Sequence, residues 1–188
     1  MKDKRGTQDV VIAIDVSISM KKQVADFLPS KLEAAKEAAA VAVDRLLSSP
    51  LNRAGIVVFY EHALPLTPLT SDKKMLLRAI GSINYGLQGS APGEAVVASV
   101  KMLRRSPASR SKKVVMLTDG DSNAGVRLDA ASIYAKNMGA RVYILTIGRA
   151  NQRGVELIKA AMDKGGCVWL ESHSKGDLLS NIIRVLGD

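Results

Sequence analysis

The feature that most constrains the fold of this 188-residue chain is the alternation of short apolar runs with longer amphipathic stretches. Five runs are rich in β-branched residues and apolar at consecutive positions, which is typical of strands covered on both faces. They are residues 10–14, 55–60, 113–118, 141–147 and 167–170. Residues 62–66 predict a further short strand that forms a hairpin with the run at 55–60. The prolines at 65 and 68 favour a position at the edge of the sheet.

Helical patterns separate the apolar runs. Ser30 and Glu33 form a capping box ahead of an apolar face that continues to residue 46. A second helix is predicted over 129–137, ending at Gly139, and a third apolar stripe covers 178–186. This order predicts a three-layer, Rossmann-like α/β fold with an open, mostly parallel sheet, one short antiparallel edge strand and helices on both faces. We expect a single domain over residues 1–188, because no repeat or linker divides the chain.

Composition excludes several classes of protein. A chain with 47% hydrophobic and 24% charged residues is not disordered as a whole. Cys167 is the only cysteine, which excludes an intramolecular disulfide and a cysteine metal site. The apolar runs are far too short to span a membrane, and the polar start of the chain does not resemble a signal peptide. A cytoplasmic protein is the default expectation, and a domain cut from a membrane-anchored protein would look the same.

The chain is basic, with a net charge of +9. An excess of positive charge can favour binding to nucleic acid, to an anionic membrane or to an acidic partner, or it can only increase solubility. We expect no nucleic-acid binding, because no basic run interleaved with aromatics, RNA-recognition motif or zinc-finger spacing occurs. One basic cluster precedes the run at 113–118 and should lie at the sheet edge where that strand begins, as a second binding surface or as an aid to solubility. It consists of Arg104, Arg105, Arg110, Lys112 and Lys113.

Polar side chains follow two of the apolar runs, at the points where the predicted strands end. Asp15, Ser17 and Ser19 follow the first run, and Asp119 follows the run at 113–118. Alternate residues of an extended segment point the same way, so one carboxylate and two hydroxyls can converge. Open α/β sheets bind ligands at this edge, where the strand order reverses. Hard oxygen donors without histidine or thiolate favour Mg²⁺, Mn²⁺ or Ca²⁺ over zinc or copper.

A purely structural interpretation of the same residues is that Ser17 and Ser19 cap a turn or helix. The joint occurrence of both serines with two aspartates at one predicted edge favours a ligand site instead. Asp121 is interpreted as a solvated loop residue or an outer partner of the site. The two histidines, at 62 and 173, are interpreted as surface or packing residues, and Cys167 as a small buried hydrophobe.

These motifs resemble the metal-ion-dependent adhesion site of von Willebrand factor type A domains. Residues 15–19 match the family's D-x-S-x-S and residues 118–120 its T-D-G. In the loop at 89–94, Ser90 stands in place of the family's threonine, and Ile18 stands where the family usually has glycine. The resemblance covers nearly the whole chain. The sequence most resembles bacterial and archaeal members of the family, including those linked to MoxR-type ATPases.

The resemblance implies a metal site, a cofactor and a partner. The metal residues would be Asp15, Ser17, Ser19, Ser90 and Asp119, with the serines contacting the metal and the aspartates contacting it directly or through water. The cofactor would be Mg²⁺ (or Mn²⁺ or Ca²⁺). One coordination position would remain for an Asp or Glu of a protein partner, with a MoxR-type ATPase system as a candidate. The expected function is a metal-dependent protein-binding module for adhesion or assembly, not an enzyme.

Two alternatives stay open at this point. A Mg²⁺-dependent phosphohydrolase would use the same aspartates, although such enzymes typically carry a second acid two residues after the first, where this chain has Ser17. Neither a phosphate-binding glycine motif nor a G-x-S-x-G elbow occurs. The other alternative is a module whose bound metal is structural and whose partners bind elsewhere.

Overall fold

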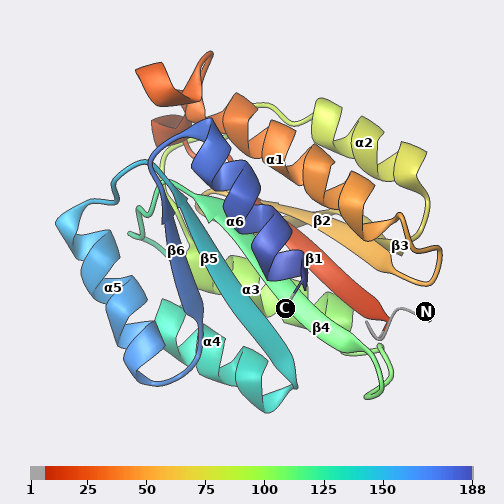
Figure 1. Ribbon diagram of the computed structural model, residues 1–188. Coiled ribbons are helices and arrows are strands. Elements are labelled where there is room, and N and C mark those ends of the chain that lie inside the picture. The colour runs from red at the N-terminus through yellow and green to blue at the C-terminus, as the bar shows by residue number, and fades with distance from the viewer. Residues whose placement is uncertain (1–6, 188) are drawn as a thin grey trace.

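The computed structural model describes residues 7–187, in which six strands form one sheet in the order β3-β2-β1-β4-β5-β6 (Figure 1). Neighbouring strands pair in parallel except β2 and β3, which are antiparallel. The strands are β1 (Gln8–Asp15), β2 (Arg53–Phe59), β3 (Ala63–Thr70), β4 (Ser111–Thr118), β5 (Ala140–Ile147) and β6 (Val168–Ser172). The predicted mostly parallel sheet with an antiparallel edge strand is therefore confirmed, and every predicted strand overlaps an observed one.

Helices cover both faces of the sheet, which confirms the three-layer α/β architecture. They are α1 (Lys31–Leu46), α2 (Lys73–Gly81), α3 (Pro92–Leu103), α4 (Leu128–Asn137), α5 (Gln152–Asp163) and α6 (Lys175–Gly187). The first face carries α1, α2 and α6, and the other carries α3, α4 and α5 (Figure 1). In β1, Val10, Ile12 and Ile14 pack toward the first group, whereas Val11 and Ala13 pack toward the second. Because strand side chains alternate between faces, a strand covered on both sides must be apolar at consecutive positions.

Two predicted helix caps are present. The Ser30 hydroxyl accepts a hydrogen bond from the backbone N–H of Glu33 at 3.2 Å, and so begins α1 as the capping box indicated. Gly139 follows α4 with a φ of +74°, a left-handed conformation that glycine adopts without steric cost. The first cap bears on function, because it places the first turn of α1 beside the polar edge of the sheet.

The structure corrects two details of the strand predictions. The edge strand β3 extends to Thr70 and includes both prolines, with irregular register against β2. An edge strand tolerates proline because one row of its backbone groups is unpaired in any case. Cys167 lies just before β6 and packs against the core, but it is only partly buried and not the buried strand residue that we predicted. Its partial burial still raises the pKa of the thiol to about 11, which keeps it protonated at neutral pH.

The polar N-terminal stretch 1–6 and residue 188 lie outside the described residues, and the expected single domain over residues 1–188 stays a prediction. Within residues 7–187, no helix combines the length and the apolar character needed to cross a membrane.

The basic cluster lies where β4 begins, at the edge opposite to the end of that strand, as predicted. Its members differ in what they contact. Arg104 and Arg105 are exposed, whereas Arg110 forms an ion pair with the buried Asp9 at 2.7 Å. Lys113 is 1% exposed, and its ammonium donates to the carbonyl oxygen of Val185 at the end of α6. Arg110 and Lys113 therefore stabilise the fold through buried contacts, and the cluster is not a uniform charged surface.

Candidate metal centre

The polar residues gather where β1 and β4 end, at the point where the strand order reverses. After β1 the chain adds β2 on one side, whereas β4 and β5 extend the sheet on the other. The parallel register pairs Ile14 with Leu117, so Asp15 at the end of β1 lies level with Thr118 at the end of β4. Loops that leave two neighbouring strands at this edge diverge and leave room between them for a ligand.

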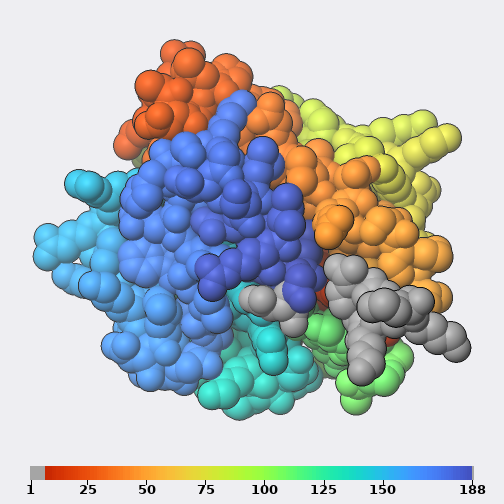
Figure 2. Space-filling view, in the orientation of Figure 1, coloured from red at the N-terminus to blue at the C-terminus, as the bar shows by residue number. Residues whose placement is uncertain are grey.

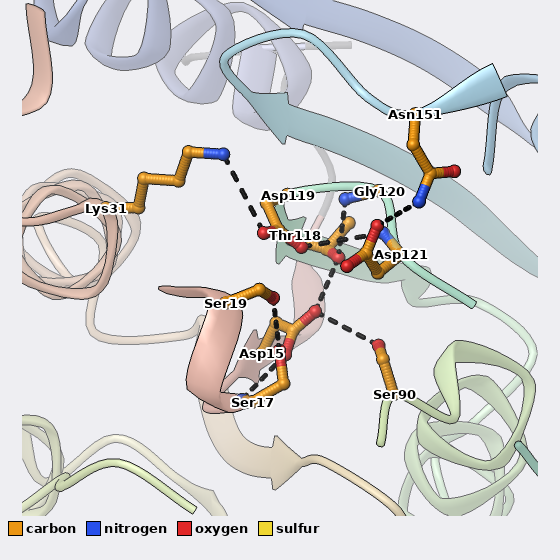
Figure 3. Close-up of polar contacts among 10 residues, drawn as sticks. All are labelled: Asp15, Ser17, Ser19, Lys31, Ser90, Thr118, Asp119, Gly120, Asp121 and Asn151. Carbon is orange, nitrogen blue, oxygen red and sulfur yellow. Dashed lines mark hydrogen bonds and ion pairs between the residues drawn. The ribbon is translucent and has the colours of Figure 1, made fainter. Parts of the chain in front are cut away.

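Asp15 lies at the centre of the cluster and is fully buried (Figure 3). Its Oδ1 accepts the backbone N–H of Ser17 at 2.9 Å. Its Oδ2 accepts the hydroxyl of Thr118 at 2.7 Å and that of Ser90 at 3.2 Å. Three separate segments therefore converge on one carboxylate, and the side chain of the predicted Ser90 does reach the site.

Ser17 precedes a short 3₁₀ turn, Ile18–Lys21, as its N-cap, and Ser19 lies within that turn. The hydroxyl oxygens of Ser17 and Ser19 are 3.0 Å apart. Ser17 is buried and Ser19 is partly exposed, while the intervening Ile18 points to solvent. The two hydroxyls converge as predicted, but a 3₁₀ turn brings them together and not the extended segment that we predicted.

Asp119 supplies the second carboxylate, immediately after β4, and is 5% exposed. Its Oδ2 lies 3.7 Å from the ammonium of Lys31, which comes from the first turn of α1. Its Oδ1 accepts the backbone N–H of Asp121 at 3.5 Å. Asn151, the N-cap of α5, donates its side-chain amide to Asp121 and so ties the loop after β4 to α5.

Burial and the negative charge of Asp119 shift the carboxyl groups of Asp15 and Asp121 toward protonation. Burial raises the pKa of Asp15 to about 7, and the negative charge of Asp119 adds to the shift, while bonds from Ser17 and Thr118 oppose it. Burial and Asp119 also raise the pKa of Asp121 above its ordinary value, against the opposing charges of Lys22 and Lys31. The cluster thus carries more negative charge than its surroundings stabilise, and a cation placed among these carboxylates would relieve it.

A surface hollow of about 520 Å³ opens beside these residues. The hydroxyl-bearing Ser17, Ser19 and Ser90 line it together with Ile18, and Glu61 lies on its wall. A volume of this size is within the range of small-ligand sites. The hollow is large enough to hold a side chain of another molecule beside Ser19, the most exposed of the three serines.

The donor set fits a hard divalent cation. Three hydroxyls and two carboxylates are oxygen donors of the kind that Mg²⁺, Mn²⁺ and Ca²⁺ accept. Among residues 7–187, no three His, Cys, Asp or Glu side chains group into a metal site. That finding agrees with a site in which hydroxyls outnumber carboxylates. The histidines lie outside it: His62 is exposed near Glu94 and His173 near Glu171, as predicted for surface residues.

The sequence interpretation left four contributors to the site without a role. Thr118 stood in the T-D-G motif, yet its hydroxyl makes the shortest bond to Asp15. The side-chain oxygen of Asn123 accepts the backbone N–H of Ser90 at 2.8 Å and so orients that loop. Asn151 carried a recognisable signal, an N-cap residue ahead of a helical pattern. Lys31 carried none, because the direction of a lysine in a first helical turn depends on tertiary packing.

Comparisons with known proteins identify the family. The model of the von Willebrand factor type A domain matches residues 9–183. An aerotolerance-related membrane protein from Bacteroides fragilis is 23% identical, with a TM-score of 0.79, over 96% of this chain and 98% of that chain. The VWA domain of SpRpn10 is 19% identical, with a TM-score of 0.73, over 95% of this chain and 94% of that chain. Proximal thread matrix protein 1 from mussel byssus is 20% identical, with a TM-score of 0.73, over 96% of this chain and 47% of that chain.

A search of curated proteins finds no match. The structural relatives share the fold at low identity, whereas the family model matches the sequence over almost all of the described residues. The chain therefore belongs to the von Willebrand factor type A domain family.

Proposed function

We propose that this domain binds a divalent cation at the hydroxyl-rich cluster and binds a protein partner through that cation. Von Willebrand factor type A domains are typically protein-interaction or adhesion modules, which supports the general class of function. The proposed cofactor is Mg²⁺, with Mn²⁺ or Ca²⁺ as substitutes of the same chemistry. The proposed ligands are Asp15, Ser17, Ser19, Ser90 and Asp119.

The observation that carries the proposal is the uncompensated charge of Asp15. Its carboxylate is fully buried, yet its partners are hydroxyls and one backbone N–H. Within residues 7–187, no lysine or arginine forms an ion pair with it, and the nearby Lys31 contacts Asp119 instead. A buried charge is costly unless it is paired or coordinates a metal. A cation among these oxygens is the arrangement that this residue set favours.

The chain's own residues would divide the work of binding. A bound cation would supply a positive charge for a carboxylate of the partner. Ser17, Ser19 and Ser90 would hold it with neutral oxygens, so that only two carboxylates offset its charge. Thr118 and the N–H of Ser17 hold Asp15 in place, and the backbone N–H of Asp121 contacts Asp119. The partner's Asp or Glu would enter through the hollow that the serines line.

We propose no enzymatic activity for the domain. Metal-dependent phosphohydrolases typically carry a second acid two residues after the first aspartate, and that position here is Ser17. Both histidines are exposed at other places on the surface. Phosphatase assays with excess Mg²⁺ should show background rates, and turnover that Asp15→Asn abolishes would support the hydrolase instead.

Thermal unfolding with and without Mg²⁺ tests the cation site. A cation at about 100 times its dissociation constant adds about 2.7 kcal/mol to the unfolding free energy. For a domain of this size that is a rise of roughly 5–10 °C in Tm. Asp15→Ala should abolish the rise, whereas Asp163→Ala should keep it, because Asp163 is an exposed aspartate at the end of α5. Equal shifts in Asp15→Ala and wild type would refute the assignment.

Affinity capture from the source cells, with Mg²⁺ and with chelator, tests the partner. A partner that depends on the cation should be retained by the wild type with Mg²⁺ and lost with chelator and with Asp119→Ala. Members of a MoxR-type ATPase system are candidates among the captured proteins. Retention that chelator and Asp119→Ala leave unchanged would favour a structural metal and a binding surface elsewhere.

A further inference from the structure

Two large apolar side chains stand exposed at the rim of the proposed metal site. Ile18 is 46% exposed and Leu87 is 72% exposed, the highest value among the large hydrophobic residues described. The backbone N–H of Ile18 donates to the carbonyl oxygen of Leu87 at 3.3 Å, so the two residues lie on adjoining segments. We call Ile18 and Leu87 the apolar rim.

The apolar rim is continuous with the hollow of the site. Ile18 lines the hollow together with Ser17, Ser19 and Ser90, and Gln88, the neighbour of Leu87, lines it as well. The backbone N–H of Gly86 donates to the carbonyl oxygen of Val16 at 2.6 Å, which fixes the loop that carries Leu87 against the end of β1. A ligand that reaches the serine hydroxyls therefore passes the apolar rim.

The same segment offers positive charge. Lys21 and Lys22 are exposed and lie at the end of the 3₁₀ turn that begins with Ile18. The backbone N–H of Lys31 donates to the carbonyl oxygen of Lys22 at 3.3 Å, and the ammonium of Lys31 lies 3.7 Å from Asp119, so Lys22 lies close to the site. The segment that follows β1 protrudes from the top of the molecule in the space-filling view, where it appears orange-red (Figure 2). Another chain can therefore reach it.

We propose that the apolar rim selects the partner's sequence. This inference rests on the proposed function and specifies it further. The occupant is a segment of a partner protein in which an Asp or Glu is followed or preceded, within about two residues, by a large aliphatic or aromatic side chain. The acid enters the hollow toward the serines, and the apolar side chain packs on Ile18 and Leu87. Lys21 and Lys22 add positive charge near the hollow, whose lining also includes the carboxylates of Glu61 and Asp121, so the acid of the segment depends on the bound cation for its main attraction.

A displayed library of short random peptides with a fixed central Glu tests this inference. The library is selected on the wild-type domain with Mg²⁺ and eluted with chelator. We expect Leu, Ile, Met or Phe to be enriched within two positions of the Glu. Leu87→Ser and Ile18→Ala should each weaken the selected peptides about tenfold, which is the loss expected when a largely buried aliphatic contact is removed.

Leu51→Ser is the matched control. Leu51 is 63% exposed and precedes β2, at the edge of the sheet opposite to the site, so its replacement should leave peptide binding unchanged. Thermal unfolding with Mg²⁺ is recorded for each variant in parallel, so that loss of the cation is distinguished from loss of the apolar contact.

The outcomes separate this inference from the proposed function. If the wild type retains no peptide and Mg²⁺ does not raise its Tm, the proposed function fails and the inference fails with it. If Mg²⁺ raises the Tm but the selected peptides lack an apolar neighbour, or bind Leu87→Ser as tightly as wild type, only the apolar rim is refuted. A wild-type dimer that Leu87→Ser dissociates would also overturn it, in favour of a second copy of this chain.

Discussion

Asp9→Asn should show how the end of β1 opposite to the site stabilises the fold. Asp9 is fully buried, and Arg53 binds it with two hydrogen bonds, of 2.9 Å from Nε to Oδ1 and 2.6 Å from Nη2 to Oδ2. Arg110 adds an ion pair at 2.7 Å. Burial alone would raise the pKa of Asp9, but the bonds from the two arginines outweigh burial and lower it to about 2.

The free energy that the charged form of Asp9 contributes to stability, and the pH range in which it is lost, follow from that pKa. The shift from 3.8 in the unfolded chain to about 2 in the folded chain corresponds to about 2.4 kcal/mol. Because the folded pKa is the lower one, this stabilisation is fully present above pH 3.8 and is lost as the pH falls toward 2. Asp9→Asn removes the charge at every pH and leaves Arg53 and Arg110 without their shared carboxylate. Loss of one partner of a buried ion pair costs about 3–5 kcal/mol.

Urea unfolding of wild type and Asp9→Asn between neutral pH and about pH 2 measures both quantities. At neutral pH the variant should be less stable by at least the 2.4 kcal/mol derived from the pKa shift. The difference should shrink by about 2 kcal/mol as the pH falls from neutral to 2, because the folded-state carboxyl is half protonated at pH 2. Asp163→Asn, at an exposed aspartate, controls for the general effect of acid. A difference that stays constant down to pH 2 would show that the ion pairs do not stabilise the charged form of Asp9.

The remaining predictions concern cation binding and the packing of two glycines. Lys31→Met should tighten Mg²⁺ binding roughly tenfold in a calorimetric titration, since it removes a positive charge 3.7 Å from Asp119, and unchanged or weaker binding would count against the proposed site. Gly154→Ala should destabilise the domain by about 1–3 kcal/mol in urea unfolding, because its Cβ would lie 1.8 Å from the carbonyl oxygen of Gly120. Gly81→Ala in α2 is the matched control: its Cβ meets no atom within 4 Å, so stability should be unchanged or higher, and a loss equal to that of Gly154→Ala would refute the packing argument.

The fold was predictable because the strand-like apolar runs and the helical patterns between them indicate the same architecture. Runs that are apolar at consecutive positions indicated strands covered on both faces, and the spacing between the runs left room for helical crossovers. The convergence of Asp15, Ser17 and Ser19 was predicted from strand alternation, although β1 ends at Asp15 and a 3₁₀ turn brings the two serines together. Parallel pairing then placed Asp119 at the same edge. Each of these inferences needed only local geometry and the direction of the chain.

The features that escaped prediction depend on tertiary packing. Lys31 and Lys113 are basic residues in ordinary polar positions of the sequence, and only the folded chain shows one beside Asp119 and the other buried at the end of α6. Arg110 belonged to a cluster that composition alone assigned to solubility or to a binding surface, yet it pairs with a buried aspartate. Ile18 was visible as an apolar residue between two serines. Its approach to Leu87 across 69 positions of sequence required the loop to fold back onto β1.

The two ends of β1 explain why a cation is proposed at one and not at the other. Asp9 and Asp15 are both fully buried aspartates on the same strand. Arginines from both neighbouring segments contact Asp9 and lower its pKa. Asp15 is contacted by hydroxyls instead, and these are too weak to offset burial, which raises its pKa. Hydroxyls orient a carboxylate without cancelling its charge, so the Asp15 end lacks the stabilisation that the chain provides at the Asp9 end. Functional sites commonly give up stability in this way, and a positive charge from outside the chain would restore it.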